Sequence, residues 1–311
     1  MKDTRKRNLG DPLFRWLVLA CALAIVAVVA AIFWQLAVNS RESIRRFGAS
    51  FLWSAAWNPV REDYGAASSI FGTLASTLIA MALAVPLSLG IAIFLVELAH
   101  PLLGRPVGVA IELLAAVPSI IFGMWGLFVF SDFMRQHVQP CLGRTLGFLP
   151  LFQGPPMGIG MLTAGIILAV MILPYMSAVS RDVLSMVPPV VKESAHGLGA
   201  TTWEVTRQVS LPYAIQGLLG ACFLGLGRAI GETMAVTFVI GNSHRVSASL
   251  FEAGNSIAST LANEFGESIA EPLSRSVLIE LGLILFCITL FFQILAQLWL
   301  RSLRGKLGRT K

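Results

Sequence analysis

Arg228 and Glu232 are two residues of opposite charge that fall within an apolar stretch, Ile215 to Ile240, four positions apart. In a helix this spacing places both side chains on one face. A charge near the middle of a bilayer costs roughly 2.5–3.5 kcal/mol on insertion scales, so this face must turn toward protein or water. A guanidinium presents a planar fork of N–H donors that matches an oxyanion. The pair therefore predicts a path for a transported anion, with Glu232 holding the fork when no anion is bound.

The same two residues have a second interpretation, a permanent buried ion pair that only fixes helix packing. A buried ion pair is a costly way to stabilise a protein, because both charges lose their hydration. Gly227 and Gly231 form a small-xxx-small pair on an adjacent face, a pattern that lets a neighbouring helix approach closely. We therefore expect a packed helix that carries its polar pair toward a central seam.

A second motif connects the fourth apolar stretch to the fifth, from Pro188 to Glu204, and reads PPVVKESAHGLGATTWE. Its prolines suit the start of a helix, and Gly199 suits the left-handed position just after a helix end. Thr201 and Glu204 have the spacing of a capping box that starts another helix. The motif predicts a short helix, a tight turn and a second helix. Such a knob can dock into a soluble partner and transmit its movement, although a plain amphipathic connector would have the same pattern.

Several kinds of chemistry have no residues to perform them. No G-x-x-x-x-G-K-[ST] loop occurs, so we expect no ATP hydrolysis by this chain. No catalytic triad or carboxylate dyad on a shared loop is visible. The four cysteines form no C-x-x-C pair and the four histidines are scattered, so we expect no metal, no cofactor and no disulfide. The energy for transport must come from a partner or from an ion gradient.

The composition places these motifs in a membrane. Hydrophobic residues make up 56% of the 311 residues and charged residues 13%, whereas soluble domains carry about a quarter charged residues. A soluble enzyme and a nucleic-acid-binding protein are therefore poor fits, and the net charge of +6 indicates contact with membrane lipid. We predict an all-α membrane protein with six transmembrane helices. The six stretches are Trp16 to Val38, Phe71 to Val96, Gly108 to Phe130, Met157 to Val179, Ile215 to Ile240 and Val277 to Leu300.

The distribution of lysine and arginine predicts the orientation. With six spans, 14 of the 23 basic residues fall in the tails and in the loops on their side, against 8 on the other side. Both termini should therefore be cytoplasmic. This gives cytoplasmic tails at 1–15 and 301–311, a first span at 16–38, a periplasmic loop at 39–70, and a core at 71–300 with a cytoplasmic loop at 180–214. Arg41, Arg45 and Arg46 go against the rule. A cleaved signal peptide is the minor alternative for the first span.

Two strings in these regions resemble a known family. The segment ESAHGLGAT, followed by VSLP, resembles the "EAA" loop of ABC importer permeases, with Ser194 in place of Ala and Val209 in place of Ile. A second resemblance is to phosphate-specific ABC transporter permeases of the PstC type. It rests on the string GRAIGETMAV and on VPSIIFGMWGLF, which begins at Val117, and it extends from about residue 71 to 300. The related PstA type usually continues G-E-T with A-P-L.

This resemblance implies a type I ABC importer permease fold in the bacterial inner membrane and an inorganic phosphate substrate. It implies that Arg228 and Glu232 are the transport-critical pair, and that Glu193, Ala195 and Gly199 are contact and turn positions toward the ATP-binding subunit. The implied partners are a PstA-type permease, two ATP-binding subunits and a periplasmic phosphate-binding protein. Transport of sulfate or molybdate, and a gradient-driven anion carrier or channel, remain alternatives. A carrier often shows two repeated halves, and no second copy of either motif occurs.

Overall fold

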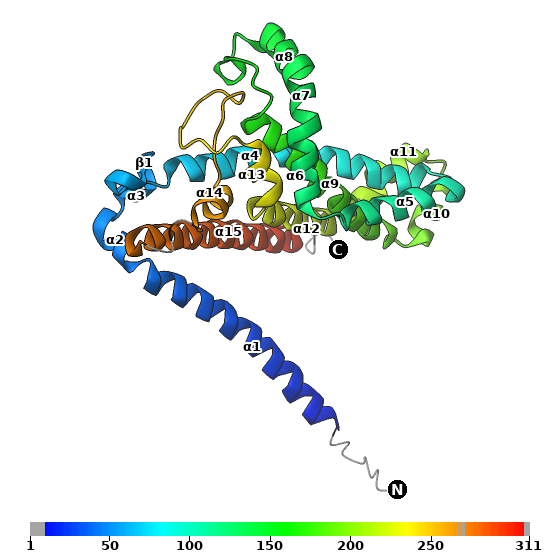
Figure 1. The fold of residues 1–311 in the computed structure, drawn as a ribbon. Helices are drawn as coiled ribbons and strands as arrows, with labels where there is room; N and C mark the ends of the chain where they lie inside the picture. Colours follow the sequence, from blue (N-terminus) through cyan, green and yellow to red (C-terminus); the bar gives the residue numbers. More distant parts are fainter. Residues whose placement is uncertain (1–9, 267, 269–270, 308–311) are drawn as a thin grey trace.

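The computed structural model describes residues 10–266, 268 and 271–307, and within them the chain is almost entirely helical (Figure 1). The long helices are α1 (Gly10–Asn39), α4 (Ala67–Ile93), α5 (Pro101–Ala115), α9 (Met161–Ser185), α12 (Leu211–Ile230) and α15 (Pro272–Leu307). The shorter ones are α2 (Arg41–Phe47), α3 (Ser50–Trp53), α6 (Ser119–Trp125), α7 (Ser131–Phe133), α8 (Gln139–Leu146), α10 (Pro189–Gly197), α11 (Thr202–Val205), α13 (Met234–Val239) and α14 (Ile257–Glu264). Strands β1 (Trp57–Asn58) and β2 (Asp63–Tyr64) form a small antiparallel hairpin.

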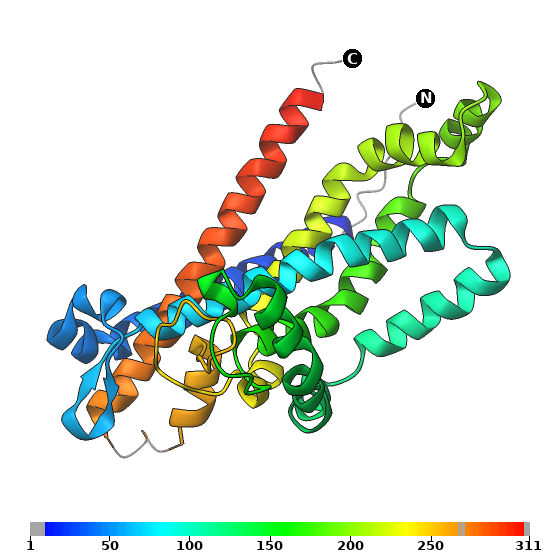
Figure 2. The ribbon, with the colours of Figure 1, turned by 90° about the horizontal axis from the view of Figure 1, so that it is seen from above.

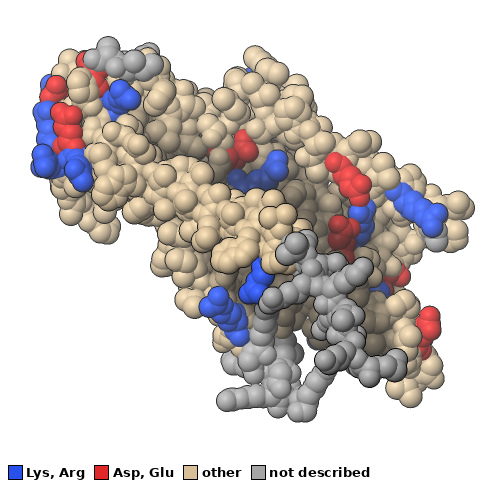
Figure 3. All heavy atoms as spheres, turned by 90° about the horizontal axis from the view of Figure 1, so that it is seen from below, with Lys and Arg blue, Asp and Glu red and all other residues tan. Residues whose placement is uncertain are grey.

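Five of the described helices are long and apolar enough to cross a membrane, and a bent pair brings the number to as many as six. Four of them contain the predicted first, second, fourth and sixth stretches almost entirely. The first, α1, is unlike the rest, because most of it stands away from the bundle and none of its apolar window is buried (Figure 1). Its C-terminal part contacts α15, for example through Phe33 and Phe286. In the space-filling view, charged residues gather in a few small clusters and leave broad uncharged surface between them, which suits contact with lipid (Figure 3).

The third predicted span, Gly108 to Phe130, is wrong as a single straight helix. The chain turns by 89° between α5 and the helical segment that begins with α6. The turn lies at Val117 and Pro118, because proline disfavours helical geometry in the residue before it and then starts α6 at its N-cap. Beyond the turn, α6 continues through π-helical and α-helical segments to Leu146.

The fifth predicted span, Ile215 to Ile240, is also not continuous. Helix α12 ends at Ile230 with Gly231 as its C-cap, and α13 begins only at Met234. Glu232 lies in the break and its Oε1 accepts a hydrogen bond from the Ala235 N–H at 3.3 Å. A glycine that ends one helix and a carboxylate that accepts from the start of the next explain the break.

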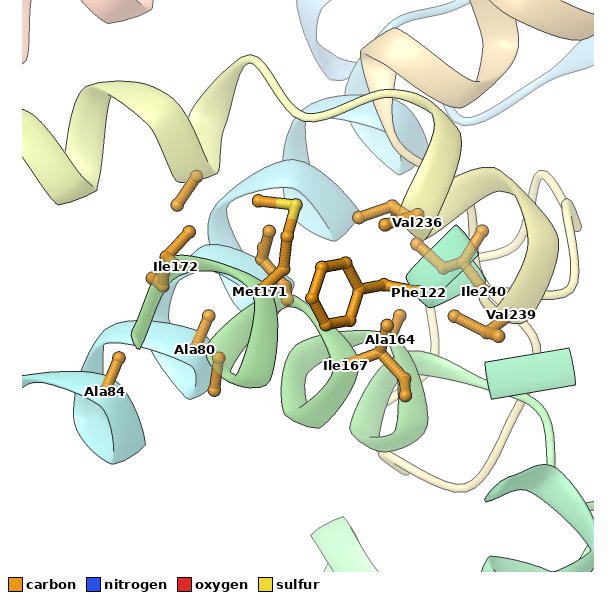
Figure 4. Packing of buried hydrophobic residues seen from close by; sticks show 14 of the residues in the cluster. Ala80, Ala84, Phe122, Ala164, Ile167, Met171, Ile172, Val236, Val239 and Ile240 are labelled. Atoms are coloured by element: carbon orange, nitrogen blue, oxygen red, sulfur yellow. The ribbon is translucent and has the colours of Figure 1, made fainter. Parts of the chain in front are cut away.

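The core forms where α4, α9, α12 and α13 pack together. Helices α4 and α9 lie side by side through small residues of α4 such as Ala80 and Ala84. Phe122 of α6 reaches into the same cluster between α9 and α13 (Figure 4). Gly123 allows this approach, because a Cβ there would lie 3.0 Å from the Ala235 Cα. The short helix α6 is therefore fixed directly against the segment that follows Glu232.

The bundle has two distinct ends (Figure 2). One end carries α2, α3 and the β hairpin, which together form the predicted loop 39–70. The other end carries α10, α11 and the end of α15. Residues 1–9 and 308–311 of the two basic tails lie outside the described residues. The assignment of these ends to the periplasm and the cytoplasm stays a prediction from the basic residues.

Candidate substrate path and coupling loop

Arg228 lies in the last turn of α12, with its side chain at the surface of the chain. Its guanidinium carbon lies over the ring of Tyr175, a residue of α9, 5.5 Å from the ring centroid. A cation held against the face of an aromatic ring keeps its N–H donors available to another acceptor. Arg228 can therefore bind an oxyanion while Tyr175 positions it.

Glu232 does not form the expected pair with Arg228. None of the ion pairs between described residues joins the two, because the helix ends between them and Glu232 is held at the start of α13 instead. The expectation that they share one continuous helix face is wrong. Both still lie within one helical turn of the break between α12 and α13, so a movement of this break would change their separation.

The two glycines of the small-residue pair have different surroundings. A Cβ on Gly227 would lie 2.8 Å from Nε2 of Gln293, so this position permits close packing of α12 against α15. Gly231 is exposed, and a Cβ there would meet only the Gly227 carbonyl oxygen at 3.7 Å. Gly227 therefore packs within the chain, whereas Gly231 belongs to the surface that carries Arg228.

The α10–α11 knob, which is the motif from Pro188 to Glu204, has the local structure that its sequence indicates. Gly199 has a φ of +89°, just after the end of α10. The Gly199 N–H donates to the His196 carbonyl at 2.9 Å and the Ala200 N–H donates to the Ala195 carbonyl at 3.2 Å. This pair of bonds is a Schellman motif. Thr201 and Glu204 then form the expected capping box at the start of α11.

Apolar side chains cover the exposed side of this knob. Leu198 is 91% exposed and Trp203 64%, and Val190 and Glu193 are exposed as well. Ala195 is partly covered within α10. The opposite side is tied to the bundle by Lys192, whose Nζ lies 2.8 Å from Oε1 of Glu97 in the π-helical segment Phe94–Leu98 that continues α4. A rigid knob with an uncovered apolar tip can receive a partner and pass its movement to α4 and α12.

Several residues of these sites were not identified from the sequence. Tyr175 and Gln293 reach Arg228 and Gly227 from other helices, so no local pattern indicated them. Glu112 of α5 pairs with Arg181 of α9, with 2.5 Å between their side-chain atoms. Glu280 lies buried on α15. The sequence assigns no role to either carboxylate. Gly123 lies in the string VPSIIFGMWGLF, where a glycine among bulky apolar residues could have indicated close packing of two helices.

At the other end, one of the three arginines that violate the charge rule has a local partner. Arg46 pairs with Glu62 at 2.7 Å between their side-chain atoms. Both residues are about half exposed, so the pair contributes little stability.

The family model described as "binding-protein-dependent transport system inner membrane component" matches residues 84–305. The chain belongs to this family. The matched region contains both the break between α12 and α13 and the α10–α11 knob.

Curated relatives are similar over nearly the whole chain. The "Phosphate transport system permease protein PstC" of Haemophilus influenzae is 52% identical over 303 residues, which cover 96% of each chain. The protein of the same name from Mesorhizobium japonicum is 47% identical and covers 98% of this chain and 94% of its own. A "probable" member from Methanocaldococcus jannaschii is 38% identical and covers 86% of each. Likeness at this level extends well beyond the shared fold.

Solved structures share the fold at low identity. A bacterial alginate ABC transporter in complex with an alginate pentasaccharide-bound periplasmic protein matches with a TM-score of 0.61 and 15% identity, covering 94% of this chain and 96% of its own. An inward-facing MetNI methionine ABC transporter matches with a TM-score of 0.56 and 18% identity, covering 75% and 94%. These permeases establish the type I ABC importer fold of this inner membrane component.

Proposed function

We propose that this chain is the membrane-spanning permease subunit of an ATP-driven importer of inorganic phosphate, in the bacterial inner membrane. The observation that carries the proposal is the 52% identity to a phosphate transport permease over 96% of both chains. Arg228 supports it, because a guanidinium exposed at the end of an intramembrane helix can bind an oxyanion. The exposed surface around Arg228 and Gly231 would be covered by a second permease of the PstA type.

Transport then proceeds by alternating access. One of the two ATP-binding subunits docks on the α10–α11 knob, where Leu198 and Trp203 offer an uncovered apolar surface. Glu193, Ala195 and Gly199 are the contact and turn positions of this knob. Closure of the ATPase dimer pushes the knob. Because α11 continues into α12, this push reaches the break that contains Glu232. A periplasmic phosphate-binding protein delivers the anion at the opposite end, and the anion passes Arg228 on its way inward.

The test is uptake by the reconstituted complex with phosphate, sulfate and molybdate offered separately. Phosphate uptake that depends on ATP and on the ATP-binding subunits supports the proposal. Uptake of sulfate or molybdate alone refutes the substrate, and uptake driven by an ion gradient without ATP refutes the ABC mechanism.

The role of Arg228 is tested by Arg228→Gln, with Arg105→Gln as the matched control. Arg105 is exposed on α5, so its replacement removes the same charge elsewhere in the membrane domain. We expect Arg228→Gln to lower phosphate uptake at least tenfold while the complex still assembles, and Arg105→Gln to transport normally. Full uptake by an assembled Arg228→Gln complex contradicts the transport role, and failure to assemble supports a role in packing.

A further inference from the structure

A polar stripe runs along the second half of α15, a helix that is otherwise strongly apolar. Gln293, Gln297 and Arg301 follow one another at intervals of four residues. Each interval advances about 6 Å along the helix axis, and the three side chains stay on nearly the same face. Neither glutamine amide makes a hydrogen bond within the described chain. Polar groups without partners are costly in an apolar surrounding, so this stripe requires water, a ligand or a partner.

The stripe lines a groove of about 400 Å³ between α15 and α12. The remaining lining residues are apolar or glycine, and none of the lining residues is acidic: Gly220, Phe223, Leu224, Ala296 and Leu300. All three polar side chains can donate N–H groups, two as neutral amides and one as a guanidinium. The groove therefore presents hydrogen-bond donors to an anion without any carboxylate to repel it.

The groove starts at Leu224, one helical turn from Arg228 along α12. On α12, Gly220, Leu224 and Arg228 share one face at four-residue intervals. The two helices run in opposite directions, and Gly227 of α12 meets Nε2 of Gln293 at the level of Arg228. From there the groove follows both helices away from the break, past Gly220 and Leu300, to Arg301. It therefore follows α15 toward Arg301, and the C-terminal part of α15 lies at the end of the bundle that carries α10 and α11 (Figure 2).

Building on the function proposed above, we propose that Gln293, Gln297 and Arg301 form the inner half of the oxyanion path, between Arg228 and the cytoplasm. The anion moves from the guanidinium of Arg228 to the two amides and then to Arg301, and successive residues of the stripe lie about 6 Å apart along α15. Neutral amides bind a phosphate-like anion weakly, so they replace part of its lost hydration without trapping it. A conducting path needs sites of this kind, strong enough to enter and weak enough to leave.

Cysteine accessibility in the assembled transporter tests this path. The native Cys21, Cys141, Cys222 and Cys287 are first replaced by serine or alanine. Gln297→Cys is then treated with the anionic reagent methanethiosulfonate ethylsulfonate, and Leu295→Cys serves as the control. Leu295 lies on nearly the opposite face of α15 and is 51% exposed. We expect Gln297→Cys to react, phosphate to slow its reaction at least threefold, and Leu295→Cys to show no phosphate effect.

A transport measurement completes the test. Gln297→Glu places a carboxylate of the same size in the path, so we expect phosphate uptake to fall at least tenfold while assembly and ATP hydrolysis persist. Loss of assembly in Gln297→Glu, or protection of Gln297→Cys by neither phosphate nor sulfate, overturns the proposal and indicates hydrogen bonding to the partner permease instead. If sulfate protects and is transported while phosphate is not, the stripe stands and the substrate of the proposed function is wrong. If phosphate uptake is normal in Gln297→Glu, the function stands and the stripe is wrong.

Discussion

The ion pair between Lys192 and Glu97 holds the α10–α11 knob on the bundle, and replacing one of its residues measures how much it stabilises this contact. The Lys192 side chain is 19% exposed and that of Glu97 8%, with Nζ and Oε1 2.8 Å apart. The pair joins α10 to the π-helical segment that continues α4, and α10 makes few other polar contacts with the bundle. Replacing Lys192 by methionine keeps the length of the side chain and leaves the Glu97 carboxylate buried without its partner.

The expected cost follows from that burial. Removing one partner of a buried ion pair costs about 3–5 kcal/mol, and the partial exposure of Lys192 favours the lower end, about 3 kcal/mol. At 1.4 kcal/mol for each tenfold change, α10 should open about a hundredfold more often. Glu97→Gln should cost less, because Lys192 can extend its ammonium to water. The double variant Lys192→Met with Glu97→Gln should recover most of the loss, since no unpaired charge stays buried.

Hydrogen exchange measured by mass spectrometry on the assembled transporter checks these values. Exchange of the α10 backbone amides reports local opening of that helix. Ser194→Ala is the matched control, because its hydroxyl bonds only to the Val190 carbonyl within the same helix. We expect the control to exchange as the wild type does. Unchanged α10 exchange in Lys192→Met, or a double variant that exchanges as fast as Lys192→Met, would refute the reasoning.

Two further predictions concern Gly199, in the turn after α10, and His244, in the loop that follows α13. Gly199→Val should destabilise the knob by about 1–2 kcal/mol, because the φ of this residue is +89°. Gly197→Ala is the control and should be tolerated, because a Cβ there meets open space. Thermal unfolding of the two variants measures this difference. His244 stacks on Trp57 and accepts from the Asn255 amide, and its burial lowers its pKa to about 4. The unfolded chain takes up this proton near pH 6.5 and the folded chain only near pH 4, so stability should be lost as pH falls through that window. The loss of melting temperature between pH 7.5 and pH 5.0 should be smaller for His244→Gln than for the wild type. An equal loss in the two proteins speaks against burial of a neutral imidazole.

The long apolar stretches and their caps could be predicted from local sequence. Most of the predicted stretch from Met157 to Val179 lies in the single helix α9, which begins at Met161, because about 20 apolar residues can satisfy their backbone groups in lipid only as a helix. Gly199 and the Thr201–Glu204 box produced the expected turn, since their bonds are made within a few residues. Signals of this kind depend on neighbours in the chain and survive in almost any tertiary setting.

The two broken spans show where hydropathy alone is insufficient. Apolar content is the same on both sides of Pro118 and of Gly231, so a count of apolar residues runs through each break. Proline at the first and glycine at the second gave a local hint, but each was equally compatible with a kink or with helix packing. The outcome depended on α6 and α13 packing against each other and against α9 through Phe122 (Figure 4). This packing stabilises the two breaks only when all three helices are in place.

What the sequence by itself determined is the membrane as solvent, the helical fold, the presence of an arginine within an apolar stretch and the form of the α10–α11 knob, because each follows from composition or from contacts within a few residues. Only the tertiary structure decided which side chains surround Arg228. It separated Arg228 from Glu232, brought Tyr175 to the guanidinium and placed Gln293 beside Gly227. These contacts join helices distant in sequence, and their formation depends on how whole helix faces pack rather than on any local preference.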